Sequence, residues 1–285
     1  MILIADSGSS KTNWSLIDDD SNIQTATTSG INPFYQEKAE IANLLQEQFT
    51  LPKEQIQSIH FYGAGCIPEK TAILEEVLFS FFGVNTIEVN SDLLAVARSL
   101  CQSEEGIVGI LGTGSNSCYY DGEKITQNIS PLGYILGDEG SGAVLGKKLL
   151  ADILKNQVST HIAQDFHYTY GLSAAQILDK IYRQAFPNRF LAQFTTFISN
   201  HISDSEIKRL VEDSFTEFIQ RNILQYSEYN RLPIHFSGSI AFHFKSNLEN
   251  AFSRAHLKLG KIVRCPMEGL IEYHLSPRPP HKGGS

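Results

Sequence analysis

A run of small and hydroxyl-bearing residues near the start of the sequence has the composition of a phosphate-binding turn. It begins at Asp6, continues as Ser-Gly-Ser-Ser-Lys to Thr12, and follows the apolar segment Ile2–Ile4. Backbone N–H groups and hydroxyls at one tight bend can surround a polyphosphate. Asp6 would suit a magnesium ion beside those phosphates, because magnesium prefers oxygen ligands and keeps several waters. An ordinary β-hairpin with a polar turn is the alternative.

The same arrangement occurs a second time further along the chain. The apolar segment Gly106–Leu111 runs into Gly-Thr-Gly-Ser-Asn-Ser, residues 112–117, and the chain leaves through Cys118, Tyr119 and Tyr120. A strand, a small polar turn and a second strand that appear twice indicate two similar halves. We expect these halves to face each other across a cleft.

Three further polar turns follow predicted strands. Asn90-Ser91-Asp92 ends one strand, Gly137-Asp-Glu-Gly-Ser-Gly142 precedes a predicted helix over 143–154, and Ser237-Gly-Ser-Ile-Ala241 ends a strand over 232–236. Each turn by itself is a weak signal, because glycine and serine are common in turns. Their order along the chain is the specific feature.

The elements between these turns alternate between strand and helix. Strands are predicted over 23–28, 58–63 and 86–89, with helices over 36–49, from Pro68, and from Ser91 or Asp92. This order predicts an α/β protein with parallel crossovers. The region 172–229 is predicted to be mostly helical, with one buried face formed at helical spacing by Ile207, Leu210, Val211, Phe215, Phe218 and Ile219.

Composition excludes several classes of partner. The 285 residues are 42% hydrophobic and 19% charged, which indicates a globular protein. The formal net charge of −8 argues against a nucleic-acid partner. A basic leader and a long apolar stretch are lacking, so we expect a cytoplasmic location and no membrane partner. The four cysteines, Cys66, Cys101, Cys118 and Cys265, show no paired metal-ligand spacing and are expected to be buried thiols.

The ordered turns resemble those of the actin, sugar kinase and Hsp70 ATPase superfamily. The most similar branch contains N-acetylglucosamine kinase and the BadF/BadG/BcrA/BcrD ATPases, and the 137–142 segment is the most branch-specific part. The resemblance implies an α/β fold of two ribonuclease H-like, actin-like ATPase domains that face a cleft. We place the N-terminal domain at 1–112 and the C-terminal domain, with a helical insertion and a loose tail, at 113–285.

The resemblance also implies an ATP and magnesium site. The first turn would grip the β- and γ-phosphates, with Asp6 directed at the magnesium ion, and the second turn would close on the phosphates from the other domain. Family members usually have more glycine in the first turn than this chain does. Near the ribose and base we expect Gly238 and Ser239. The predicted cofactor contacts are Asp6, Gly8, Ser9, Ser10, Lys11, Thr12, Gly112, Thr113, Gly114, Gly238 and Ser239.

In this family the aspartate at the position of Asp92 is the catalytic base. It would take a proton from the attacking hydroxyl as that oxygen approaches the γ-phosphorus. A helix N-cap is the alternative role for Asp92. The resemblance further implies sugar contacts from Asn32, Asp92, Gly114, Asn116 and Asp138. The alternatives are a turn or cap role for Asp138 and a turn role for Asn32 before the proline that follows it.

The resemblance therefore implies ATP-dependent phosphorylation of an amino sugar, most simply N-acetylglucosamine at its 6-hydroxyl. N-acetylmuramic acid and glucosamine stay open as substrates. The first alternative is an ATPase coupled to a partner protein, like the dehydratase activators, which hold an iron–sulfur cluster through cysteines. The second is a non-catalytic sugar or nucleotide sensor. A homodimer is an expectation from the family alone.

Overall fold

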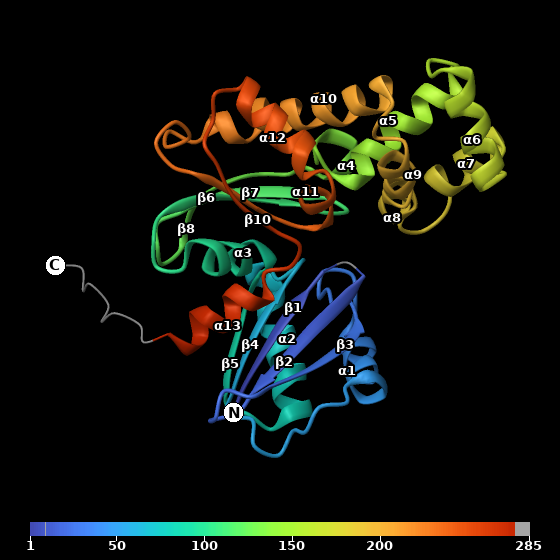
Figure 1. Ribbon diagram of the computed structural model, residues 1–285. Coiled ribbons are helices and arrows are strands. Elements are labelled where there is room, and N and C mark those ends of the chain that lie inside the picture. Colours follow the sequence, from blue (N-terminus) through green and yellow to red (C-terminus); the bar gives the residue numbers. More distant parts are fainter. Residues whose placement is uncertain (9, 277–285) are drawn as a thin grey trace. The chain divides into compact units, whose positions relative to one another are not determined.

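A computed structural model describes residues 1–8 and 10–276. The chain divides into two compact units. The first consists of Met1–Glu104 and the segment that begins at Pro266, and the second is Glu105–Cys265. Each unit is built on one five-stranded mixed sheet (Figure 1).

The sheet of the first unit has the strand order β3-β2-β1-β4-β5. Strands β1 and β2 are antiparallel, as are β2 and β3, whereas β4 runs parallel to both β1 and β5. The carboxyl ends of three parallel strands therefore lie at one edge of the sheet. The strands are β1 (Ile2–Ser7), β2 (Lys11–Ile17), β3 (Ile23–Ser29), β4 (Ser58–Gly63) and β5 (Thr86–Ser91).

Successive residues of β1 supply two different cores, because side chains alternate between the faces of a strand. Leu3 and Ala5 join the core that contains Trp14 and the apolar faces of α1 (Lys38–Gln48) and α2 (Pro68–Phe82). Ile4 lies in the other core, together with Ala95 of α3 (Asp92–Cys101) and Leu270 of α13 (Met267–Leu275). Helices cover both faces of this sheet, and α13, the last helix within the described residues, packs beside α3 (Figure 1).

The second sheet repeats the topology of the first. Its order, read from the opposite edge, is β8-β7-β6-β9-β10. The first three strands of this unit, β6 to β8, are again antiparallel neighbours, and β9 and β10 follow parallel to β6. The two similar halves expected from the sequence are thereby confirmed. The strands are β6 (Gly106–Leu111), β7 (Ser115–Tyr120), β8 (Ile125–Ile129), β9 (Ile234–Ser237) and β10 (Leu259–Val263).

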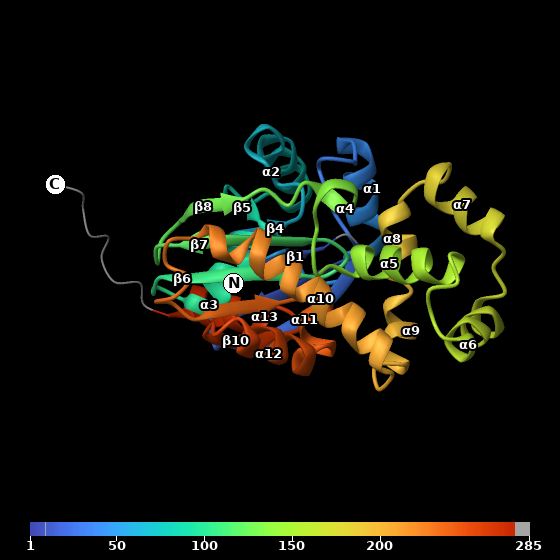
Figure 2. The ribbon, with the colours of Figure 1, turned by 90° about the horizontal axis from the view of Figure 1, so that it is seen from above.

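Helices inserted between β8 and β9 make the second unit larger. Figures 1 and 2 both show α6 to α9 gathered beyond one end of the second sheet. The inserted elements are α4 (Gly133–Leu136), α5 (Gly142–Leu154), α6 (Thr160–Tyr170), α7 (Ala174–Tyr182), α8 (Pro187–Ala192), α9 (Thr195–Asn200), α10 (Ser205–Arg221) and the 3-10 turn Ile223–Gln225. Two helices follow β9: α11 (Ser239–His243) and α12 (Lys245–Arg254).

The structure divides the chain at other points than the expected boundary between 112 and 113. The first division precedes β6, because β6 pairs with β7 and β9 in the second sheet. The second division follows Cys265, because α13 packs against α3 rather than against the second sheet. The loose tail was expected from Ser276 onward; Ser276 is the C-cap of α13, and residues 277–285 lie outside the described residues. In the described part of the chain, no helix combines the length and hydropathy needed to cross a membrane.

Candidate active site

The register of the first sheet brings the predicted turns to one edge. Ser7 of β1 pairs with Gly63 of β4, which in turn pairs with Ser91 of β5. Asp6 lies one residue before this row and Asp92 one residue after it. Parallel pairing thus places the turn after β1 near the start of α3, although the two segments are far apart in sequence.

The first glycine turn is tight and open to solvent. The N–H of Gly8 donates to the carbonyl of Lys11 at 3.0 Å, and the exposed residues of the turn are Gly8, Ser10 and Lys11. An exposed turn with a hydroxyl and with a lysine at the start of β2 suits an anionic ligand. Ser9, the remaining predicted contact in this turn, lies outside the described residues.

The hydroxyl of Thr12 lies inside the protein. It is 2.7 Å from the Ser7 hydroxyl, donates to the carbonyl of Ser29 at 3.2 Å and accepts from the N–H of Ile31. Both hydroxyl residues are fully buried, and Ser7 also hydrogen-bonds both backbone groups of Ile31. This network ties the turn to the segment that leads to Asn32. Thr12 is also paired with β1 and β3 through its backbone, so its role here is to hold the turn in place.

Asp92 is the first residue of α3, and the cap of this helix is its neighbour. The Ser91 hydroxyl accepts from the N–H of Leu94 at 3.2 Å, so the alternative role of Asp92 as N-cap is wrong. Burial raises the pKa of Asp92 to about 6, and the charge of Asp6 acts in the same direction, against the N–H groups of Leu93 and Asp92 itself. A carboxylate in this environment is a better base than an exposed aspartate.

Asn32 forms the turn before Pro33, as its alternative role predicted. Its Oδ1 accepts from the N–H of Phe34 at 3.0 Å, and its own N–H donates to Oε1 of Gln36 at 2.6 Å. The carboxamide also lies against Gly65, where a β-carbon would be only 2.0 Å from Oδ1. The side chain of Asn32 is therefore held in one orientation.

Three glycine turns of the second unit meet at the end of β6. The N–H of Gly112 donates to the carbonyl of Gly114 at 2.9 Å, and the Gly112 carbonyl accepts from Gly142 at 2.8 Å. The third turn, at Gly238, also packs against the end of β6, because a β-carbon at Gly238 would lie 2.3 Å from the carbonyl oxygen of Leu111. Gly238 has a φ of 120°, a conformation that favours glycine. The predicted order of turns thus becomes a cluster in space.

Asp138 faces the turn at residues 112–114, which follows β6. Its Oδ1 accepts from the N–H of Ser115 at 3.2 Å, and a β-carbon at Gly114 would lie 3.1 Å from its Oδ2. Burial raises the pKa of Asp138 to about 6. Ser141, not Asp138, caps α5, since its hydroxyl accepts from Val144. The alternative role of Asp138 as a helix cap is therefore wrong.

The neighbouring acidic residue, Glu139, fastens this loop to α10 and the residue after it. Its two carboxylate oxygens pair with Arg221 at 2.7 Å and with the amide of Asn222 at 3.2 Å. Asn116 is also fixed, because its Oδ1 accepts from the amide of Asn128 at 2.9 Å. Asp138 and Asn116 are thus carried by braced segments of the second unit. Ser239, at the start of α11, is exposed.

One turn near the site was not predicted from the sequence. Residues 63–66, Gly-Ala-Gly-Cys, follow β4, and the N–H of Ala64 donates to the carbonyl of Ser7 at 3.0 Å. Gly65 touches Asn32, and the charge of Asp92 contributes to the raised pKa of Cys66. The two glycines that follow a strand were the available signal.

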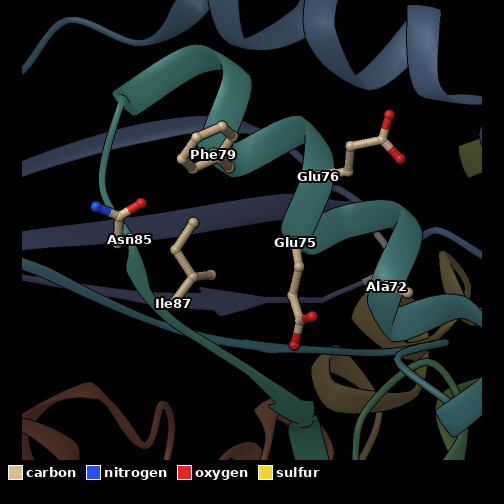
Figure 3. A pocket seen from close by; sticks show the side chains of 6 residues that line it. All are labelled: Ala72, Glu75, Glu76, Phe79, Asn85 and Ile87. Atoms are coloured by element: carbon tan, nitrogen blue, oxygen red, sulfur yellow. The ribbon is translucent and has the colours of Figure 1, made fainter.

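A pocket of about 310 Å³ lies elsewhere on the first unit. Figure 3 shows its lining on α2 and around the start of β5, at the other end of that strand from Asp92. None of the predicted site residues lines it. The lining residues are Ala72, Glu75, Glu76, Phe79, Asn85 and Ile87.

The cysteines do not assemble into a metal site. Cys66, Cys101 and Cys118 are buried and Cys265 is partly exposed. Across residues 1–8 and 10–276, no group of three or more His, Cys, Asp or Glu side chains could hold a metal ion. A magnesium ion bound through one carboxylate, water and phosphate oxygens does not need such a group.

Comparisons with known proteins identify relatives along the whole chain. The crystal structure of the "Putative N-acetylglucosamine Kinase" of Porphyromonas gingivalis is 46% identical, with a TM-score of 0.93, and the match covers 96% of this chain and 98% of that one. The protein of the same description from Chromobacterium violaceum is 17% identical over 95% and 98% of the two chains, with a TM-score of 0.73. A ROK family glucokinase from Streptomyces griseus, 13% identical over 95% and 97% with a TM-score of 0.55, shares the fold.

A curated relative is the N-acetylmuramic acid/N-acetylglucosamine kinase of Clostridium acetobutylicum, 25% identical over 195 residues. That match covers 63% of this chain and spans 64% of the relative's length. No family model matches the sequence. The identity to the P. gingivalis protein over nearly the full length of both chains is decisive. The chain belongs to the N-acetylglucosamine kinase family, whose members are sugar kinases of the actin-like ATPase fold.

Proposed function

We propose that this sugar kinase transfers the γ-phosphoryl group of ATP to the 6-hydroxyl of N-acetylglucosamine. The names of the P. gingivalis and C. acetobutylicum relatives both include this sugar. The observation that carries the proposal is the environment of Asp92. Its carboxylate lies directly after β5, and its pKa is raised to about 6. Because Ser91 caps α3, the carboxylate of Asp92 is not needed as the cap.

In this proposal Asp92 is the general base. A sugar hydroxyl is too weak an acid to lose its proton to a carboxylate in advance, so Asp92 would orient the hydroxyl and accept its proton late in the reaction. The carboxylate is ionised at neutral pH with a pKa of about 6. Placement of the hydroxyl in line with the γ-phosphorus would supply most of the remaining acceleration.

The exposed first turn supports an ATP site. In the first unit we assign phosphate binding to Gly8, Ser10 and Lys11. In the second unit we assign it to the turn 112–114, and we assign the adenosine to Gly238 and Ser239. Asp6 fits a magnesium ion, because it is a carboxylate near the end of β1, beside the exposed turn, and magnesium prefers oxygen ligands. When bound, the ion would neutralise charge on the phosphates.

Each unit holds polar groups that suit a sugar. In the first unit Asn32 is held in a fixed orientation by its neighbours. In the second unit Asn116 and Asp138 are held in the same way, and the backbone of Gly114 lies beside Asp138. Carboxylates and amides with set directions suit sugar hydroxyls, which both donate and accept. Burial raises the pKa of Asp138. A hydroxyl that donates a hydrogen bond to this carboxylate would stabilise its ionised form.

N-acetylmuramic acid is the second candidate substrate. It carries a lactyl carboxylate, which would favour a cationic neighbour. Lys147 of α5 is close enough to Asp138 for their charges to interact, and its Nζ donates to the carbonyl of Tyr134 at 2.6 Å. The observation that favours this substrate is a lysine whose charge acts on the carboxylate that we assign to the sugar.

The test is product identification with ATP and magnesium. N-acetylglucosamine, N-acetylmuramic acid, glucosamine and glucose are compared, and the phosphorylated position is read by phosphorus–proton NMR. We expect a 6-phosphate with N-acetylglucosamine and no ADP release with its 6-deoxy analogue. Phosphorylation at another hydroxyl would refute the proposed position. ADP release that is the same with and without every sugar would indicate a partner-coupled ATPase instead.

A further inference from the structure

The turn at residues 63–66, which joins β4 to the segment before α2, is fixed in place by the first strand. The N–H of Ala64 donates to the carbonyl of Ser7 at 3.0 Å, and the N–H of Cys66 donates to the carbonyl of Gly63 at 3.3 Å. A β-carbon at Gly63 would lie 3.4 Å from that of Ser7 and 3.2 Å from Sγ of Cys66. The turn therefore cannot move independently of the end of β1.

Gly65, in the middle of this turn, is the surface on which Asn32 rests. A β-carbon at Gly65 would lie 2.0 Å from Oδ1 of Asn32 and 2.8 Å from its Cγ. These separations are shorter than any non-bonded contact allows, and Oδ1 is already engaged by the N–H of Phe34. The carboxamide of Asn32 can keep its orientation only while position 65 has no side chain.

The other end of the same turn reaches toward Asp92. Cys66 is buried, and burial, followed by the charge of Asp92, raises the pKa of its thiol to about 12. The thiol therefore stays neutral beside the carboxylate. One short turn thus lies against Asn32, which is assigned to the sugar, and next to Asp92, which is assigned to the reacting hydroxyl.

We infer that Gly65 is a positioning residue, which sets the carboxamide of Asn32 for sugar binding without touching the sugar. The inference rests on the proposed function, because it takes Asn32 as a sugar contact. Two separate properties require glycine here: the φ of 76°, which side chains rarely adopt, and the space that Asn32 occupies. Only the second of these properties concerns the sugar.

Gly83 provides a matched control for the first property. It caps α2 with a φ of 69°, and a β-carbon there would meet nothing within 4 Å. Gly65→Ala and Gly83→Ala therefore introduce similar backbone strain, but only Gly65→Ala displaces Asn32. We expect Gly65→Ala to raise the KM for N-acetylglucosamine about tenfold, the order of a lost hydrogen bond, with the KM for ATP within about twofold of wild type. For Gly83→Ala we expect both constants to stay within about twofold.

A double-mutant cycle with Asn32→Ala tests whether Gly65 acts through Asn32. Once Asn32 is truncated, we expect Gly65→Ala to add less than about twofold to the sugar KM. Thermal stability gives a second reading. Gly65→Ala should lower Tm more than Gly83→Ala does, and this excess should shrink in the Asn32→Ala background, because the overlap with Oδ1 and Cγ of Asn32 is gone while the looser contact with Cβ of Phe34, at 3.0 Å, remains. This reading holds even when Gly65→Ala is too unstable for kinetics.

The outcomes separate the inference from the proposed function. An active wild type, together with a Gly65→Ala sugar KM equal to that of Gly83→Ala, would overturn the inference and leave the function intact. Full additivity of Gly65→Ala and Asn32→Ala in KM and Tm would overturn it as well. A wild type without any sugar-dependent ADP release would overturn both.

Discussion

Replacing Asp92 by asparagine is expected to stabilise the folded protein at neutral pH while it removes activity. The carboxylate is placed where its ionised form is unfavourable, because burial and the charge of Asp6 raise its pKa from the ordinary 3.8 to about 6. Asparagine has nearly the same shape and no charge. The substitution should therefore relieve a cost that the native protein bears at its active site.

The size of the effect follows from the difference between the two pKa values. A rise from 3.8 to about 6 corresponds to about 3 kcal/mol of free energy of unfolding at pH 7. Asp92 keeps some contact with solvent, so we expect about 1–3 kcal/mol. A raised pKa means that the favourable contribution is complete below pH 3.8 and is lost as the pH rises through about 6. The advantage of Asp92→Asn should therefore be present at pH 7 and nearly absent at pH 4.

Urea unfolding followed by tryptophan fluorescence measures this effect directly. Trp14 is the single tryptophan of the chain and is fully buried in the same unit as Asp92. Asp20→Asn, at an exposed aspartate after β2, serves as the control and should leave the free energy of unfolding unchanged. The reasoning is refuted when Asp92→Asn is no more stable than wild type at pH 7. An equal gain at pH 4 and pH 7 would also refute it.

Three further outcomes follow from the site. The kcat/KM of the wild type should fall about tenfold per pH unit below about pH 6, where Asp92 is protonated; a flat profile of ADP release from pH 5 to 8 would contradict this. Asp138→Asn should raise the sugar KM about tenfold or more without changing the KM for ATP, and equal changes in both would remove Asp138 from the sugar site. Ser7→Ala should lower the free energy of unfolding by about 1–3 kcal/mol, because Ile31 loses buried hydrogen bonds; a loss below about 0.5 kcal/mol in urea unfolding would count against that network.

The repeated strand-turn-strand pattern was predictable because apolar runs end abruptly at glycine and hydroxyl residues. Strands β4 and β6 begin and end where the sequence predicts, and α2 begins at Pro68 as expected. The proline at the first helical position and the buried-type strands are strong local signals. Topology then follows from the order of the elements, since parallel crossovers admit few arrangements.

The two edge strands of the second sheet, β8 and β10, were not predicted, whereas the edge strands β3 and β5 of the first sheet were. Strand β8 reads Ile-Thr-Gln-Asn-Ile and is half exposed, and β10 pairs on one side only, so neither shows a long apolar run. The packing position of α13 could not be predicted from the sequence either. Its packing on α3 joins residues from opposite ends of the chain, and local patterns carry no information about such contacts.

The site was predictable in its residue types but not in its environments. Asp92 and Asp138 were chosen for their turns, whereas the burial that raises the pKa of each depends on the folded packing. Thr12 shows that residue type alone can mislead. It was predicted to contact phosphate, but its hydroxyl lies in an internal hydrogen-bond network. The contact between Gly65 and Asn32 depends on a close approach in space that neither segment indicates alone.

The central claim is that Asp92 accepts the proton from a sugar hydroxyl during phosphoryl transfer. The most direct measurement is ADP release with ATP, magnesium and N-acetylglucosamine at pH 7.5 for wild type and Asp92→Asn, each with and without the sugar. The account predicts sugar-dependent release by the wild type and a loss of about 10²–10⁴-fold in the variant, with the affinity for the sugar retained. Turnover by Asp92→Asn within about tenfold of wild type, or wild-type release that ignores the sugar, would contradict it.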